Sequence, residues 1–307
     1  MTEVVAVGDA VGDAGPVRGT AAGPHPLLRW FEVAGRADLP WRATRDPWAV
    51  LVAEVMLQQT QVSRVVPKYA AFLEQFPTAS DCAAASAADV IGAWEGLGYN
   101  RRALGLWRAA TAVVTDHGGV VPGRLEALLA LPGIGAYTAR AVLAFAFEAD
   151  AAVVDTNVAR VLARREGRRL GRAEAQRLAD GAVPAGAGWA WNQAMLDLGA
   201  TICTARSPGC DRCPLQEGCG WAAGGRAEPD PAVGSAGVSG RQAAFAGSDR
   251  QGRGRLVRAL RSGPVADSAL ASAMGWPDDR DRAERVVAGL LADGLVARSD
   301  VGWTLPG

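Results

Sequence analysis

Between Leu27 and about Ala200, apolar residues recur in runs of helical length, and alternating strand-like stretches are few. The prolines Pro77, Pro122, Pro132 and Pro184 separate these runs. Helices are expected over 26–35, 47–62, 65–76, 86–96, 101–116, 124–131, 136–147, 156–165, 174–182 and 189–199. Segments of this kind bury their apolar faces by packing helix on helix, so the predicted fold class is all-α.

Composition along the 307 residues predicts four regions. Residues 1–24 contain Gly, Ala and acids without periodicity and are expected to be a disordered lead-in, followed by a helical core over 25–221. Residues 222–252 are rich in Gly, Ala, Pro and Ser, which is typical of a linker. Helical periodicity resumes over 253–307, which ends in two short strand-like runs, so we predict a small winged-helix-like module there.

Counts of basic residues exclude two kinds of chemistry. Lys68 is the single lysine in the sequence, which leaves almost no candidate for Schiff-base catalysis. The two histidines, His25 and His117, have no metal-ligand spacing, so a histidine-based zinc hydrolase is excluded. A basic signal region and a membrane-length apolar stretch are both absent, so we expect a cytoplasmic protein with no membrane partner.

The net charge is zero, but arginines cluster in two places. Seven lie within 160–177, and five lie within 250–261, where no acid occurs. Clustered arginines fit either a phosphate-binding face or ordinary solvated helix faces. In the second cluster Arg255, Arg258 and Arg261 share one helix face, which we expect to contact DNA phosphates.

Four of the five cysteines follow the pattern Cys203-x6-Cys210-x2-Cys213-x5-Cys219. A cytoplasmic compartment keeps thiols reduced, so zinc and iron–sulfur ligation are the alternatives. The arrangement has one CxxC flanked by single cysteines rather than two paired knuckles, which favours a [4Fe–4S] cluster over zinc. Cys82 lies apart in a helical region and is expected to be a buried apolar residue.

Three further features are ambiguous when each is considered alone. Gly133 and Gly135 permit a tight turn that exposes N–H groups at a helix start, which suits a phosphate but also any helix–helix turn. Asp155 precedes a helix and fits an ordinary N-cap. Glu54 lies among apolar residues, where burial would raise its pKa toward that of a general acid.

Taken together, these motifs resemble the adenine DNA glycosylases of the MutY type, within the helix-hairpin-helix superfamily that includes endonuclease III. The resemblance covers about Leu27 to Trp221. It is carried by the four-cysteine loop and by strings at 39–42 (LPWR), 54–62 (EVMLQQTQV), 96–99 (GLGY), 131–135 (LPGIG), 154–157 (VDTN) and 192–199 (NQAMLDLG).

The resemblance implies two helical lobes, a six-helix barrel and a lobe that binds the cluster, with the N-terminal helix returning to the cluster lobe. It also implies a repair enzyme that flips adenine out of duplex DNA opposite 8-oxoguanine or guanine. Glu54 would protonate N7 of adenine, and Asp155 would stabilise the sugar cation with help from Asn157. Tyr137 occupies the position of the Schiff-base lysine of bifunctional relatives, so an uncut abasic site is expected.

The same resemblance assigns the substrate contacts. Leu57 and Gln193 would line the adenine pocket, supported by Trp41 and Arg42. Tyr99 would wedge into the base stack. Gln59 and Thr60 would contact the space opposite, with Gln58 in the same string. The chain departs from the family at Asn100, where a second tyrosine is usual, and at Thr156, where glycine is common. The tail is also shorter and lacks the string that reads 8-oxoguanine.

Two alternatives remain open at this point. A related glycosylase acting on thymine or uracil opposite guanine also has tyrosine at the hairpin position, although Glu54 with Gln58, Gln59 and Thr60 fits the adenine enzymes better. A non-catalytic iron–sulfur DNA-binding protein would be expected to have lost the catalytic carboxylates, and both are present. We therefore expect a monomeric enzyme that binds double-stranded DNA.

Overall fold

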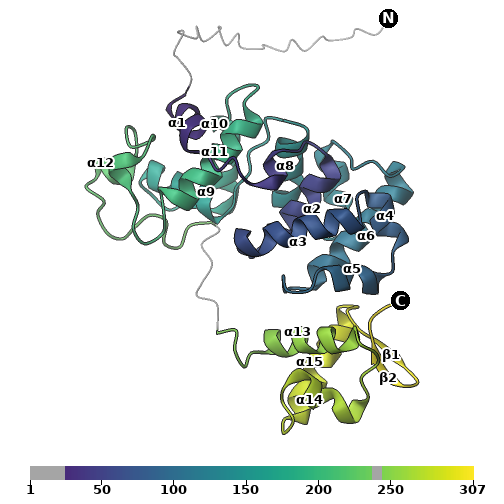
Figure 1. The fold of residues 1–307 in the computed structure, drawn as a ribbon. Helices are drawn as coiled ribbons and strands as arrows, with labels where there is room; N and C mark the ends of the chain where they lie inside the picture. The colour runs from purple at the N-terminus through teal and green to yellow at the C-terminus, as the bar shows by residue number, and fades with distance from the viewer. Residues whose placement is uncertain (1–24, 237–243) are drawn as a thin grey trace, which may run out of the picture.

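The computed structural model describes residues 25–236 and 244–307 (Figure 1). The expected lead-in, 1–24, lies outside the described residues, as does part of the expected linker. The described chain forms two helical lobes followed by a C-terminal module. We call the first the barrel lobe; it contains η1 (Pro40–Arg42), α2 (Pro47–Leu57), α3 (Val62–Gln75), α4 (Ala79–Ala84), α5 (Ala87–Ala93), α6 (Arg101–His117), α7 (Leu125–Ala130) and α8 (Ala136–Ala146).

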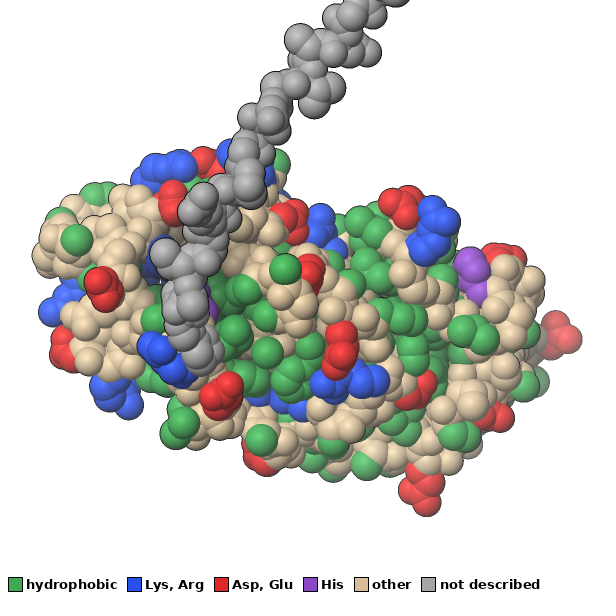
Figure 2. Space-filling view, turned by 90° about the horizontal axis from the view of Figure 1, so that it is seen from above, with side chains coloured by type: hydrophobic (Ala, Val, Ile, Leu, Met, Phe, Trp, Pro, Cys, Tyr) green, Lys and Arg blue, Asp and Glu red, His purple; other side chains and the backbone are tan. Residues whose placement is uncertain are grey.

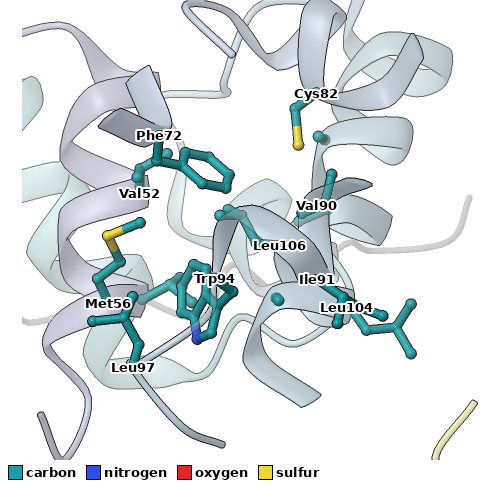
Figure 3. Packing of buried hydrophobic residues seen from close by; sticks show 14 of the residues in the cluster. Val52, Met56, Phe72, Cys82, Val90, Ile91, Trp94, Leu97, Leu104 and Leu106 are labelled. Atoms are coloured by element: carbon teal, nitrogen blue, oxygen red, sulfur yellow. The ribbon is translucent and has the colours of Figure 1, made fainter. Parts of the chain in front are cut away.

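Helix α2 is the centre of the barrel lobe. It contacts α3, α6 and α8, which explains why its sequence is apolar on nearly every side. Figure 3 shows Val52 and Met56 of α2 packed with Phe72, Trp94 and Leu106 from the surrounding helices. Cys82 points into the same core and is fully buried, far from the other four cysteines in the sequence.

The expected helix over 47–62 is interrupted in the structure. Helix α2 ends at Leu57 and α3 begins at Val62, because Gln59 adopts a left-handed backbone conformation with φ 54°. Periodicity alone did not indicate this break, although residues 58–61 (QQTQ) are all polar, because a helix also tolerates polar residues on an exposed face. Helix α4 was also missed, although Thr78 and Asp81 form a capping box at its start.

The cluster lobe contains α1 (Pro26–Ala34), α9 (Thr156–Glu166), α10 (Arg172–Ala182), α11 (Gly188–Thr201), η2 (Cys210–Arg212) and α12 (Gly220–Ala223). Its separate core includes Leu27 of α1 together with Val161 and Leu198. Because α1 packs against α11, the N-terminal helix returns to this lobe as expected. The two-lobed all-α prediction is confirmed.

The C-terminal module consists of α13 (Asp249–Leu260), η3 (Asp267–Ala269), α14 (Leu270–Met274), α15 (Arg280–Ala292), β1 (Ala297–Ser299) and β2 (Gly302–Thr304). Strands β1 and β2 pair antiparallel, and Val265 forms a bridge to Trp303. The module thus has three helices followed by a hairpin, and the hairpin also contacts the segment after α13. This is a winged-helix-like arrangement, as predicted. Helix α13 begins at Asp249, before the expected start, because the Ser248 hydroxyl accepts a hydrogen bond from the N–H of Gln251.

The C-terminal module contacts the barrel lobe through arginines of α13. Arg258 and Arg261 both form ion pairs with Glu95, and Arg250 Nη1 lies 3.2 Å from the Tyr99 hydroxyl (Figure 1 shows the module beside α5). The side chains of Arg258 and Arg261 remain 71% and 42% exposed in these pairs, so the contact of this arginine face with DNA phosphates stays a prediction. The two arginines share this one carboxylate of the barrel lobe, a partner that the local sequence could not show.

On the face turned away from the C-terminal module, basic and acidic side chains are interspersed among apolar ones (Figure 2). No single sign of charge dominates this face, in agreement with the net charge of zero. Within residues 25–236 and 244–307, no helix is both long enough and apolar enough to cross a bilayer.

Candidate active site and cluster loop

Glu54 lies on α2 in the interior of the barrel lobe. Asp46 caps this helix and Pro47 occupies its first position, which fixes the start of α2 and hence the direction of Glu54. The residue is 5% exposed. Its Oε2 atom is buried without a hydrogen-bond partner in the described protein.

The surroundings of Glu54 keep its carboxyl group near the midpoint of titration at neutral pH. Burial raises the pKa of Glu54 to about 7, and the negative charge of Asp155 acts in the same direction. A hydrogen bond from Tyr137 and the charge of Arg42 oppose this rise. A carboxyl group in this condition can hold a proton at pH 7 and release it to a bound substrate.

Tyr137 occupies the first turn of α8, directly after the glycine hairpin. Burial, reinforced by the charges of Glu54 and Asp155, keeps the pKa of the Tyr137 phenol well above its ordinary value. The phenol therefore remains neutral at physiological pH and serves as a hydrogen-bond donor to Glu54. The hairpin thus contributes a side chain to the same site as α2.

Asp155 is the N-cap of α9 and also faces the other two groups. Its Oδ1 accepts hydrogen bonds from the N–H groups of Asn157 and Val158, both at 2.8 Å, and its Oδ2 accepts one from Asn157 Nδ2 at 2.9 Å. Burial raises the pKa of Asp155 above its ordinary value, although these hydrogen bonds oppose the rise. Its charge also acts on Glu54 and Tyr137, so the cap and the site coincide.

Helix α11 holds the segment that leads to Asp155. The side chain of Asn192 accepts a hydrogen bond from the Val153 N–H at 2.8 Å and donates one to the Ala151 carbonyl at 2.9 Å. A Cβ atom on Gly199 would lie 2.6 Å from Cβ of Asn157, so only glycine allows this close approach of α9. Asn192 and Gly199 both belong to the 192–199 string, but the sequence did not reveal that they position the segment around Asp155.

Trp41 and Arg42 are both buried in the fold. Arg42 forms a bidentate ion pair with the fully buried Asp197, with two N–O distances of 2.8 Å, and Asp197 also accepts hydrogen bonds from Arg36. Trp41 packs edge-on against Tyr69. Arg42 therefore joins η1 to α11, and its charge reaches Glu54 from there. The sequence did not identify Asp197 as its partner.

The remaining predicted contact residues lie at three connections and on α11. Leu57 ends α2, while Gln58, Gln59 and Thr60 form the connection to α3, where the Gln58 amide donates to Thr138 Oγ1 at 3.1 Å. Tyr99 is 40% exposed in the α5–α6 connection. Gly133 and Gly135 form the hairpin, and Gln193 is buried on α11.

Position 133 can be occupied only by glycine. It has φ 78°, and a Cβ atom there would lie 3.2 Å from Cα of Gly105 on α6. Gly135 is the N-cap of α8 and has no side chain, so the N–H groups of the first turn receive no hydrogen bond from a capping side chain. This is a suitable geometry for a phosphate.

The four cysteines at 203–219 line a single cavity together with Val161, Arg164 and Leu198. In the described chain, no group of three His, Cys, Asp or Glu side chains converges closely enough to hold one metal ion. The four thiols therefore line one cavity without converging on a point where one ion could bind. This arrangement fits a cluster of several iron atoms better than a single zinc ion.

Two arginines of the 160–177 cluster are buried beside this loop. Arg160 donates from Nε to the Cys203 carbonyl at 2.7 Å and from Nη2 to Asn157 Oδ1 at 2.9 Å. Arg164 contacts Cys203 Sγ at 3.3 Å and forms an ion pair with Asp230. These two arginines therefore support the loop instead of facing a phosphate, whereas Arg168, Arg169, Arg172 and Arg177 are exposed.

Two family models match the chain. A model of the HhH-GPD superfamily base excision DNA repair proteins matches residues 52–178. A model of the iron–sulfur binding domain of endonuclease III matches residues 203–219. The chain carries a [4Fe–4S] cluster in this loop, as the cysteine spacing predicted.

Among the solved structures, a thermostable thymine-DNA glycosylase is 32% identical, with a TM-score of 0.61, and the match covers 65% of this chain and 94% of that one. Endonuclease III in a covalent complex with DNA is 25% identical, with a TM-score of 0.57 over 66% of this chain and 94% of that one. Fold, hairpin and cluster loop thus define a helix-hairpin-helix protein of base excision DNA repair.

The curated relatives make the assignment more specific. An adenine DNA glycosylase of Mycolicibacterium smegmatis is 42% identical over 289 residues, covering 91% of this chain and 94% of the relative. One of Mycobacterium tuberculosis is 41% identical over 297 residues, covering 92% of each. The chain belongs to the adenine DNA glycosylase family. These alignments cover over nine-tenths of the chain and so extend beyond the two lobes, whereas the thymine-DNA glycosylase match covers 65% of it.

Proposed function

We propose that this protein releases adenine from double-stranded DNA where it is mispaired with 8-oxoguanine or guanine, and that it leaves the abasic site uncut. The observation that carries the proposal is the buried Glu54, whose pKa is raised to about 7 beside Tyr137 and Asp155. The two carboxyl groups occupy different environments, and such a pair divides the work of breaking a glycosidic bond.

In this mechanism Glu54 transfers its proton to N7 of an adenine that has left the base stack. The bond between C1′ and N9 then breaks, and its electron pair goes to the protonated base. Asp155, held by Asn157, faces the positive charge that develops on the sugar. Water adds to C1′ and releases one proton, which replaces the proton that Glu54 gave up, so the products are free adenine and an abasic site.

The absence of strand cleavage follows from the groups beside Glu54. Tyr137 has a neutral phenol that cannot form a Schiff base with the opened sugar. Lys68, the single lysine of the sequence, is half-buried on α3, and its side chain lies near Gly96. No amine is therefore positioned to capture the abasic site in the described chain.

The contacts to DNA are proposed residue by residue. Leu57 and Gln193 border the adenine pocket, while Trp41 and Arg42 support it from within the fold. Tyr99 enters the base stack. Gln59 and Thr60, with Gln58 beside them, contact the opposite base. Gly133 and Gly135 present N–H groups to a backbone phosphate.

The cysteine thiolates of Cys203, Cys210, Cys213 and Cys219 would hold the cluster. When bound, the cluster supplies a rigid centre around which this loop folds and takes no part in the proton transfer. We further propose that the enzyme acts as a monomer on chromosomal DNA in the cytoplasm. The C-terminal module, expected over 253–307 and beginning in the structure with α13 at Asp249, would act as a separate unit joined to the two lobes through part of residues 222–252.

The test is a panel of duplexes with adenine opposite 8-oxoguanine, guanine, cytosine and thymine, together with G·T and G·U pairs. Single-turnover release of adenine opposite 8-oxoguanine and guanine, without strand cleavage before alkali, is the expected result. Activity confined to G·T and G·U pairs would replace the proposal with a thymine or uracil glycosylase. Binding to all duplexes without release of any base would indicate a non-catalytic DNA-binding protein.

A further inference from the structure

Arg102, on the first turn of α6, forms more interactions than its place in the sequence suggests. Its Nη1 atom lies 2.9 Å from the carbonyl oxygens of Val55 and Met56 and 2.6 Å from that of Gln58. These are carbonyls at the C-terminal end of α2, which that helix itself leaves without partners. Arg102 therefore caps α2 from another helix, where the negative end of the helix dipole favours a cation.

The second terminal nitrogen of Arg102 contacts both of the connections that flank it. Nη2 donates to Thr60 Oγ1 at 3.0 Å, in the α2–α3 connection, and to the Gly98 carbonyl at 3.0 Å, in the α5–α6 connection. The guanidinium carbon also lies 5.4 Å from the ring centroid of Trp94 and 5.5 Å from that of Tyr99. One planar group thus holds two loops that are about forty residues apart in the sequence.

Each of these loops contains a non-glycine residue in the left-handed region. Gln59 has φ 54° and Tyr99 has φ 50°. Such conformations persist only where surrounding contacts enforce them, and they concentrate at functional sites. Here the enforcing contacts converge on Arg102, because it binds the residue on either side of Gln59 and the residue before Tyr99.

We propose that Arg102 is a positioning residue that fixes the Gln59–Thr60 loop and the Tyr99 turn relative to each other, so that both enter the duplex together when adenine leaves it. This inference rests on the proposed function, which gives Tyr99 and Gln59 their contacts with DNA. Arg102 acts through these loops and not on the adenine itself.

The chemistry of arginine suits this role better than that of lysine. The guanidinium is a planar fork with donors on two edges, whereas an ammonium is a single point of charge on a flexible stem. Burial lowers the pKa of Arg102 to about 10, which still leaves the group charged at neutral pH. A lysine at position 102 would retain the charge near the end of α2 but could not reach both loops from two nitrogens.

The experiment compares R102K and R102A with wild type on two substrates. One is a duplex with adenine opposite 8-oxoguanine, and the other carries adenine opposite an abasic-site analogue, where no partner base has to be separated. R108A is the matched control, because Arg108 is an exposed arginine on the same helix. Single-turnover release is measured at saturating enzyme, and thermal unfolding is recorded for every variant.

We expect both Arg102 variants to release adenine about 10²-fold more slowly from the paired duplex, the size of effect that a displacement of about 1 Å causes. Release opposite the abasic-site analogue should fall by no more than about threefold. With 2-aminopurine in place of adenine, the rise in fluorescence on unstacking should be lost in the Arg102 variants and kept in R108A.

Three outcomes would overturn the inference: an unchanged rate on the paired duplex, an equal loss on both substrates, or a normal 2-aminopurine signal in R102K. If R102A fails to fold, R102K decides the question, since it retains the positive charge at the end of α2. A wild-type enzyme that releases no adenine would instead refute the proposed function, so the two failures can be distinguished.

Discussion

Replacing Glu54 by glutamine should abolish base release and at the same time stabilise the protein. Glutamine has nearly the same shape as glutamate, so α2 and its packing are retained. The proton donor is lost, and removal of a general acid typically lowers the rate about 10²–10⁴-fold. Binding to the mispaired duplex should be preserved, because the change affects proton donation alone.

The stability effect follows from the pKa of Glu54. The group shifts from an ordinary value of 4.5 to about 7 on folding, a difference of about 2.5 units. Between these values the folded state binds more protons than the unfolded state, so stability falls as the pH rises from about 4.5 to about 7. At 1.36 kcal/mol per unit, the charged form of Glu54 destabilises the wild-type protein by about 3 kcal/mol above pH 7.

Glutamine carries no such charge, so E54Q should unfold at a higher temperature than wild type at pH 8. For a domain of this size each kcal/mol corresponds to about 2–4 °C. The advantage should shrink toward pH 4.5, where Glu54 is protonated in both states of the wild type. Thermal unfolding at both pH values, measured alongside single-turnover release, tests the two effects together.

The wild-type enzyme provides a second readout of the same group. Its rate of adenine release should decline above pH 7, about tenfold per unit once Glu54 is mostly ionised, as expected for an acid that must be protonated. Two results would refute this reasoning: release by E54Q at the wild-type rate, or an E54Q protein less stable than wild type at pH 8.

The remaining predictions concern the second carboxylate, the cluster and the C-terminal module. Asp155→Asn should nearly eliminate adenine release while lowering the free energy of unfolding by at most about 1 kcal/mol, because asparagine also caps helices well. Normal activity of this variant at the same pH would mean that Asp155 serves only as a helix cap. The purified protein should be brown with about four irons per chain, and Cys213→Ser should lose iron and thermal stability together, whereas a colourless protein with stoichiometric zinc would contradict the cluster. Deleting residues 240–307 should weaken duplex binding and make the affinity less dependent on salt, while single-turnover release at saturating enzyme persists. A slower chemical step in the truncated enzyme would argue against a role of the module in binding alone.

The local sequence was sufficient to predict most of the secondary structure and the kind of chemistry. Helical periodicity, prolines and caps depend on neighbours within a few residues, so they can be recognised without the fold. The cysteine spacing likewise predicted the cluster, and the order of motifs indicated the family. The prediction of one helix through residues 57–62 was wrong, because polar residues in a short connection look the same in sequence as polar residues on an exposed helix face.

The tertiary structure decided the partners of the charged side chains. The pKa of Glu54 depends on burial and on Tyr137 and Asp155, which lie in other segments of the chain. Arg42 pairs with Asp197, and Arg102 binds the end of α2, at separations of 155 and about 45 residues. A guanidinium can serve an ion pair, a helix cap or a phosphate, and only the three-dimensional arrangement of acceptors determines which of these it binds.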